Sequence, residues 1–127
     1  MPLFWTEFVG VCCSDPEAEK RWWISSFACQ ECPVPEDWDD SLASDIVLCL
    51  PGNEAPTILI RDRRHVLAFG GSVEDERALL FCSHIRKARG FLQERGVPMG
   101  PTQAVGGAEF FEVQDPEGHE IEICTEP

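Results

Sequence analysis

Short apolar runs along the chain alternate with turn-forming residues and with amphipathic segments. The runs "FVGVCC" and "ALLFC" predict strands, and each leads through Ser into a segment whose bulky apolar residues recur at helical spacing. The first helix is expected to have Asp15 as its N-cap and Pro16 as its first residue, which places Glu19 near the positive end of the helix dipole. The second helix is expected to begin after Ser83 and to end at Gly96.

Further strands are expected after each helix. In the first half, "DIVLCL" and "PTILIRD" flank the turn-forming "PGNEAP". In the second half, "EFFEVQ" and "HEIEIC" flank "DPEG", whose Asp, Pro and Gly fit positions i, i+1 and i+3 of a type I turn. A weaker strand is expected near "FACQECPV" and near "MGPTQAV". Each half therefore predicts a strand, a helix and three more strands.

The two halves repeat one pattern. When Cys13 is aligned with Cys82, both segments read as an apolar strand, Cys-Ser and a helix, and Trp23 coincides with Leu92. The expected fold class is α+β, built from tandem βαβββ modules. The expected limits are a single domain at 1–127, a first module at 4–64, a linker at 65–76 and a second module at 77–127.

The composition is that of one globular domain. The chain has 127 residues, of which 43% are hydrophobic, and it contains no apolar run of the roughly 18 residues that a membrane span needs. The start "MPLFWTEFVG" lacks a basic region, which favours a cytoplasmic protein with no membrane partner. The net charge of −13 argues against a nucleic-acid partner. The seven cysteines are expected mostly to pack as reduced thiols in the core.

The repeat and its "FFEVQDPEGHEIEI" ending resemble the vicinal oxygen chelate superfamily over nearly the whole chain. That superfamily includes glyoxalase I, fosfomycin-resistance enzymes, extradiol dioxygenases and bleomycin-resistance proteins. The resemblance implies a curled, mixed, eight-stranded open barrel around a small-molecule cavity, often completed by a dimer partner. We therefore expect a small-molecule ligand and a homodimer. Because this scaffold hosts isomerases, transferases, dioxygenases and plain binders, the fold does not decide the function.

The resemblance also implies where a metal would bind. Metal-using members take ligands from the first, fourth, fifth and eighth strands, and the last of these positions falls on Glu122. The other three fall on Phe8, on Arg77 and near Leu59, where Arg61 and Asp62 follow. Phe8, Arg77 and Leu59 cannot bind a cation, so we expect no metal and no other cofactor.

The histidines and one cysteine pair were weighed as other donors. His65 lies in "HVLAF", which resembles a metal-binding strand of the superfamily, but that register leaves too many residues before the second helix, so His65 is assigned to the linker. His84 falls at the start of that helix, and His119 is interpreted as a solvated turn residue. Cys29 and Cys32 form a single C-x-x-C that is interpreted as strand packing, with a thiol metal site left open.

Alternation along the strands predicts which side chains face the cavity. The inward set is Phe8, Gly10, Cys12, Thr57, Leu59, Arg61, Arg77, Leu79, Phe81, Glu120, Glu122 and Cys124. The opposite set, expected under the helices, includes Val9, Val11, Leu80, Ile121 and Ile123. The ligand-binding candidates are Phe8, Cys12, Leu59, Arg77, Leu79, Phe81 and Glu122, with Trp38 in "PEDWDD" as a rim or lid residue. Alternatively, Arg77 and Glu122 pair with each other and the apolar residues fill the interior.

Two functions follow from these expectations. The first is a metal-independent binding protein of the bleomycin-resistance type, whose acidic surface sequesters a cationic or aromatic compound. The second is a glyoxalase-like or related lyase, in which Glu122 is the catalytic base and Arg77 stabilises a developing oxyanion. A thiol enzyme that uses Cys12 is a more distant alternative, because no histidine base is placed beside it.

Overall fold

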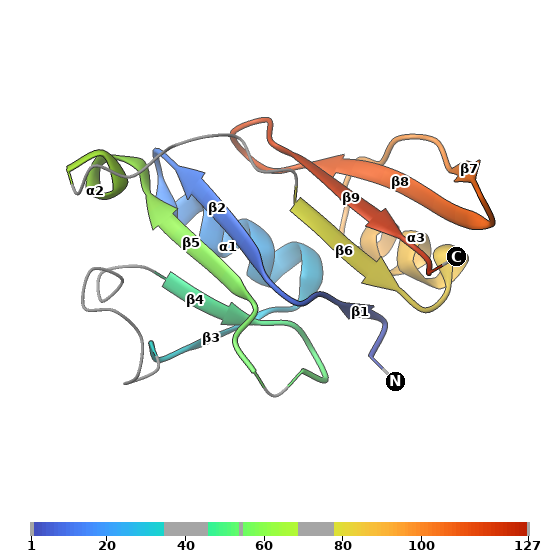
Figure 1. Cartoon of the computed structure of the whole chain (residues 1–127), viewed down its shortest axis with the longest axis horizontal. Coiled ribbons are helices and arrows are strands. Elements are labelled where there is room, and N and C mark those ends of the chain that lie inside the picture. The colour runs from blue at the N-terminus through green and yellow to red at the C-terminus, as the bar shows by residue number, and fades with distance from the viewer. Residues whose placement is uncertain (1, 35–45, 54, 69–77, 127) are drawn as a thin grey trace.

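The computed structural model describes residues 2–34, 46–53, 55–68 and 78–126. The helices and strands follow one another along the chain as Figure 1 shows. They are β1 (Phe4–Trp5), β2 (Val9–Cys13), α1 (Pro16–Phe27), β3 (Gln30–Cys32), β4 (Ile46–Cys49), β5 (Ile58–Asp62), α2 (Arg63–Ala68), β6 (Ala78–Cys82), α3 (Ile85–Glu94), β7 (Gln103–Val105), β8 (Ala108–Gln114) and β9 (Glu120–Cys124).

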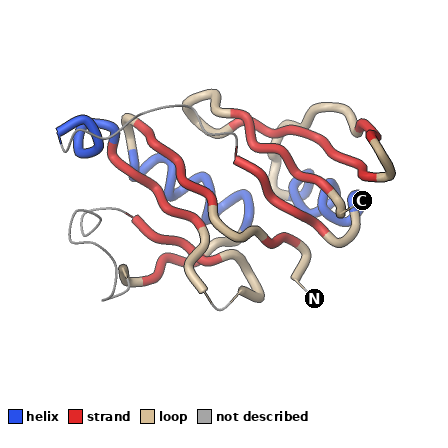
Figure 2. The backbone as a smooth tube through the Cα atoms, viewed as in Figure 1, coloured by secondary structure: helices blue, strands red, loops and turns tan. Residues whose placement is uncertain are grey.

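The described strands form two mixed sheets that lie side by side and are not closed (Figure 2). The first sheet has the order β2-β5-β4-β3, and the second has the order β1-β6-β9-β8-β7. In each sheet, the strand before the long helix pairs in parallel with the last strand of the repeat, β2 with β5 and β6 with β9. This arrangement confirms the expected α+β class and the curled open-barrel architecture.

The N-terminal apolar run differs from the expected single strand. It divides into β1 and β2, and β1 joins the second sheet by pairing with β6. Phe4 explains the division, because its buried ring makes edge contacts with Phe27 of α1 at 5.1 Å and with Phe91 of α3 at 5.6 Å. The chain also forms the short helix α2 where a linker was expected to begin.

Local signals set the ends of the helices and the last turn. Asp15 caps α1 by accepting a hydrogen bond from the Ala18 backbone N–H at 3.1 Å, as expected. In the turn between β8 and β9, the Gly118 N–H donates to the Asp115 carbonyl at 3.0 Å. Gly118 has a φ of 83°, a left-handed conformation that glycine adopts without strain. These features confirm the predicted cap and the predicted turn.

The core lies between the sheets and the long helices, and the opposite side of the sheets is open. The residues expected under the helices are all buried, namely Val9, Val11, Leu80, Ile121 and Ile123. Helices α1 and α3 lie behind the sheets in Figure 1, so the side turned to the viewer, here called the open face, carries the alternate residues. None of the described helices is long and apolar enough to cross a membrane.

Candidate functional site

The strand register of the second sheet arranges the open face in rows across the strands. One row is aromatic: Trp5 pairs with Phe81, which pairs with Cys124, which pairs with Phe110. The rings of Trp5 and Phe81 stack with their centroids 4.5 Å apart and 22° between their planes. Both side chains are half-buried. The row offers a flat apolar surface of the kind on which another ring can pack.

The next rows of the open face carry carboxylates. Leu79 pairs with Glu122, and Glu122 pairs with Glu112, so the two carboxylates lie opposite each other on neighbouring strands. One row further along, Glu120 pairs with Gln114. Glu122 is half-buried, and Leu79 is 37% exposed. A ligand placed over this sheet therefore meets aromatic rings at one end and two facing carboxylates beside them.

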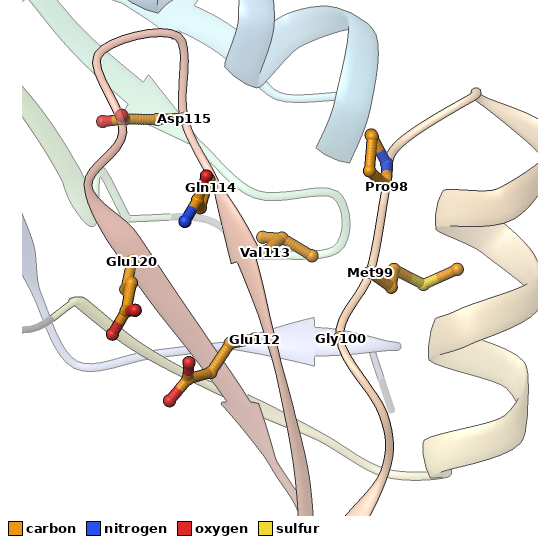
Figure 3. A pocket seen from close by; sticks show the side chains of 8 residues that line it. All are labelled: Pro98, Met99, Gly100, Glu112, Val113, Gln114, Asp115 and Glu120. Carbon is orange, nitrogen blue, oxygen red and sulfur yellow. The ribbon is translucent and has the colours of Figure 1, made fainter.

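A pocket of about 400 Å³ lies at the edge of the carboxylate rows. Figure 3 shows Glu112, Gln114 and Glu120 on β8 and β9, with Pro98 and Met99 across from them on the segment before β7. The segment before β7 is held against β8 because the Gly100 N–H donates to the Glu112 carbonyl at 2.9 Å. Apolar and acidic residues both line the pocket, and in Figure 3 the side chains of Glu112 and Glu120 point away from Met99.

The open face of the first sheet carries apolar side chains together with Arg61. Phe8 is 52% exposed, and one of its ring carbons lies 3.6 Å from where a Cβ on Gly10 would be, so both residues are on this face. Leu59 pairs with Gly10 and is buried, and Cys12 pairs with Arg61, both of which are half-buried. The predicted alternation is therefore present, although that these residues bind a ligand stays a prediction.

The residues at the metal positions implied by the resemblance do not fit a divalent cation. Leu59 pairs with Gly10 just as Glu122 pairs with Leu79, so Leu59 is the counterpart of Glu122 in the first sheet. Neither Leu59 nor the exposed ring of Phe8 has a donor atom. In the described ranges, no group of three or more His, Cys, Asp or Glu side chains is arranged to hold a metal ion. That the protein uses no metal stays a prediction.

Two predicted site residues cannot be placed. Arg77 and Trp38 lie outside the described residues, so the expected Arg77–Glu122 pair and the expected rim position of Trp38 stay predictions. His65 lies in α2, at the start of the expected linker, and His84 is the exposed N-cap residue of α3.

A buried polar cluster, which sequence reasoning missed, joins α1 to the turn between β8 and β9. Glu19 is fully buried, and its Oε1 accepts a hydrogen bond from Trp23 Nε1 at 3.1 Å. Its Oε2 meets no donor among the described residues, because the polar side chain beside it is another carboxyl, Asp115. Burial, and then the contact with Asp115, raises the pKa of Glu19 to about 9. Glu19 is therefore protonated at neutral pH, with Asp115 as the neighbouring carboxyl group.

The turn itself holds Asp115 in place. Its Oδ1 accepts hydrogen bonds from the backbone N–H groups of His119 at 2.7 Å and Glu117 at 3.0 Å, and its Oδ2 lies 2.7 Å from His119 Nδ1. The interpretation of His119 as a solvated turn residue was wrong, because a buried carboxylate binds its ring. The signal for Glu19 was its spacing: it precedes the core residue Trp23 by one helical turn and so lies on the buried face.

Glu117, in the turn between β8 and β9, contacts the start of α1 and so links the two halves. Its carboxylate accepts the backbone N–H groups of Ser14 at 2.9 Å and Asp15 at 3.1 Å, at the N-terminus of α1. A carboxylate is favoured there by the unpaired N–H groups and by the helix dipole. The "DPEG" turn is therefore a structural joint between the two halves, whereas the open face is the part of the chain that offers chemistry to a ligand.

Solved structures similar to this chain over almost its full length share its fold. A member of the glyoxalase/bleomycin resistance protein/dioxygenase superfamily from Sphaerobacter thermophilus DSM 20745 has a TM-score of 0.67 and 16% identity, over 96% of this chain and 97% of that one. TnmS3, an antibiotic binding protein from Streptomyces sp. CB03234, has a TM-score of 0.68 and 16% identity, over 95% and 94%. A lactoylglutathione lyase from Agrobacterium tumefaciens has a TM-score of 0.70 and 11% identity, over 94% and 92%.

No protein-family model matches the chain, and the comparison with curated proteins found no match. At such low identities the solved structures establish the fold and leave the ligand open. Together with the paired mixed sheets and the repeated strand register, they show that the chain has the glyoxalase/bleomycin-resistance fold of the vicinal oxygen chelate superfamily.

Proposed function

We propose that this protein binds a small aromatic cation on the open face of the second sheet, without a metal. One observation carries the proposal: an aromatic row, with Trp5 stacked on Phe81, lies next to a row in which Glu122 faces Glu112. The rows are two residues apart along each strand, which is about 6–7 Å. A ligand with a flat ring and a positive nitrogen at that distance satisfies both rows.

Electrostatics and the family likeness support the same ligand class. The net charge of −13 attracts a cation from solution, and two facing carboxylates gain from a positive charge placed between them. The adjoining pocket, at about 400 Å³, is within the usual size of small-molecule sites. The antibiotic-binding protein TnmS3 has the same fold. The homodimer and the cytoplasmic location expected above stay predictions.

The direct test compares two probes of nearly equal shape. We expect the cation 2-(2-naphthyl)ethylammonium, whose nitrogen is separated from the ring by a two-carbon chain, to bind, and the neutral 2-(2-naphthyl)ethanol to bind at least about tenfold more weakly, with an advantage that shrinks as salt is added. Fluorescence titration against the purified full chain measures both affinities. Equal affinities of the two probes at low salt would show that the carboxylates do not contribute to binding. If neither probe binds, the proposed site is wrong.

The carboxylate row gives a charge-specific prediction. We expect Glu122→Gln and Glu112→Gln each to lower the affinity for the cation by about fivefold, equivalent to about 1 kcal/mol. The affinity for the neutral probe should stay unchanged. Glu94→Gln is the matched control, because it removes the same charge from an exposed position on α3, behind the sheet. If the control weakens the cation as much as the two site variants do, the effect comes from overall charge.

The aromatic row gives the complementary prediction. Trp5→Leu keeps an apolar side chain but removes the stacking surface. The affinities for both probes are therefore expected to fall by about the same factor, roughly threefold to tenfold. The same titrations measure this, and a thermal melt shows whether the variant is folded. A variant that weakens only the cation would show that Trp5 does not act by stacking on the ring.

The lyase alternative is tested in parallel. A glyoxalase-like activity with Glu122 as base predicts turnover of the hemithioacetal formed from methylglyoxal and glutathione, and loss of that turnover in Glu122→Gln. Turnover by the wild-type chain that disappears in the variant would replace binding by catalysis as the function.

A further inference from the structure

Two thiols approach each other closely on the open face of the first sheet. The Sγ atoms of Cys32 in β3 and Cys49 in β4 lie 2.7 Å apart. This is shorter than the 3.6 Å between Cys32 Sγ and its backbone acceptor, the Val47 carbonyl. It is also within about 0.7 Å of the length of an S–S bond. Both side chains are half-buried, so a small reagent can reach them.

The register explains why these two side chains meet. Cys32 pairs with Val47, and Cys49 pairs with Gln30, so the cysteines are diagonal neighbours on the same face of an antiparallel ladder. The right-handed twist of a sheet brings one of the two diagonals closer together. β3 is the three-residue edge strand of its sheet, so only one neighbouring strand opposes a small shift of its backbone.

We propose that Cys32 and Cys49 are a dithiol site that forms a reversible disulfide with a small-molecule disulfide oxidant. One thiolate attacks the oxidant, forming a mixed disulfide and releasing one thiol. The second protein thiolate attacks the Sγ atom of the first cysteine in this mixed disulfide, which forms the Cys32–Cys49 bond and releases the other thiol. The protein loses two hydrogens, one S–S bond forms in it, and the oxidant is reduced to two thiols. This inference is independent of the proposed ligand.

The structure selects Cys49 as the partner of Cys32 and not the Cys29 of the C-x-x-C sequence. Cys29 is 3% exposed and packs in the core, whereas Cys49 contacts Cys32 directly. Burial, and then the hydrogen bond with Cys49, raises the pKa of Cys32, so Cys32 rests as a thiol at neutral pH. We therefore expect oxidation to be slow at neutral pH and to need prolonged incubation.

Peptide mapping of the oxidised full chain decides the pairing. After incubation with oxidised glutathione and blocking of remaining thiols, trypsin and an Asp-specific protease release residues 22–36, which hold Cys29 and Cys32, apart from residues 45–61, which hold Cys49. We expect these two peptides to be joined, with two hydrogens fewer than their sum, and to separate on reduction. Unjoined peptides after full incubation would overturn the proposal.

Serine variants assign the sulfur atoms. Cys29→Ser is the matched control, because it lies in the same peptide as Cys32 and should leave the link intact. Cys32→Ser and Cys49→Ser should each abolish it. A link that persists in Cys32→Ser would assign the bond to Cys29 and overturn the proposed pair. A link that forms only in denaturant would show that the folded geometry does not favour it. If a variant fails to fold, fragmentation of the joined wild-type peptides between Cys29 and Cys32 shows which of the two is bonded to Cys49.

Discussion

Replacing Glu19 by alanine is expected to lower the free energy of unfolding by about 3 kcal/mol, whereas glutamine is expected to leave it unchanged or to raise it. Alanine leaves a cavity in a fully buried position and leaves Trp23 Nε1 without its acceptor. Glutamine keeps an oxygen acceptor for Trp23 Nε1 and places an uncharged amide beside Asp115, without a group that can ionise.

Urea unfolding of the three proteins, followed by tryptophan fluorescence and circular dichroism, measures these differences near neutral pH. The comparison of alanine with glutamine separates the hydrogen bonds from the charge. Equal destabilisation by both substitutions would contradict a protonated, uncharged Glu19 in the folded chain. A stable alanine variant would show that the surrounding side chains collapse into the space.

The stability of the wild-type chain is expected to fall as pH rises, by up to roughly 4 kcal/mol between about pH 5 and pH 8. In the unfolded chain Glu19 ionises near its ordinary pKa of 4.5, whereas the folded chain keeps the proton until about 9. Between these values the folded state binds more protons, so each rise in pH favours unfolding. The contribution of Glu19 is complete below its ordinary pKa and is lost as pH rises toward the folded value.

Glu19→Gln is the control for this pH dependence, because it keeps every other ionisable group. Its unfolding free energy is expected to be flatter over the same window. The window ends near pH 8 because burial also raises the pKa of Cys13 and Cys29, which produces a loss of the same sign at higher pH. Parallel slopes for the wild type and the glutamine variant would show that Glu19 does not carry the effect.

The candidate site was predictable from the sequence only in part. Alternation placed Phe8, Leu79 and Glu122 on the open face, because side chains of a strand point to opposite sides in turn. That Glu122 faces Glu112, and that Trp5 stacks on Phe81, depends on which residues of separate strands pair. If either pair of strands shifted by one residue, these neighbours would lie on different faces of the sheet. The sequence of one strand does not show which residues of another strand it pairs with.

Packing between the two halves also decided that β1 pairs with β6 and that Glu19 is buried. From the sequence, Glu19 was interpreted as a residue near the positive end of the helix dipole, which is the usual role of an acid in the first turn. Packing against the turn of the second half buries Glu19 instead. Cys32 and Cys29 were considered together because they are near in sequence, whereas the ladder brings Cys32 to Cys49.

The sequence by itself determined the repeated order of strands and helices, the cap at Asp15, the turn at Gly118 and the buried side of each strand. These depend on interactions within a few residues and on periodicity, which any short segment carries. Only the tertiary structure decided the carboxylate rows, the thiol pair and the joint between Glu117 and the start of α1. Those contacts join residues far apart along the chain, so they exist only after both halves have packed together.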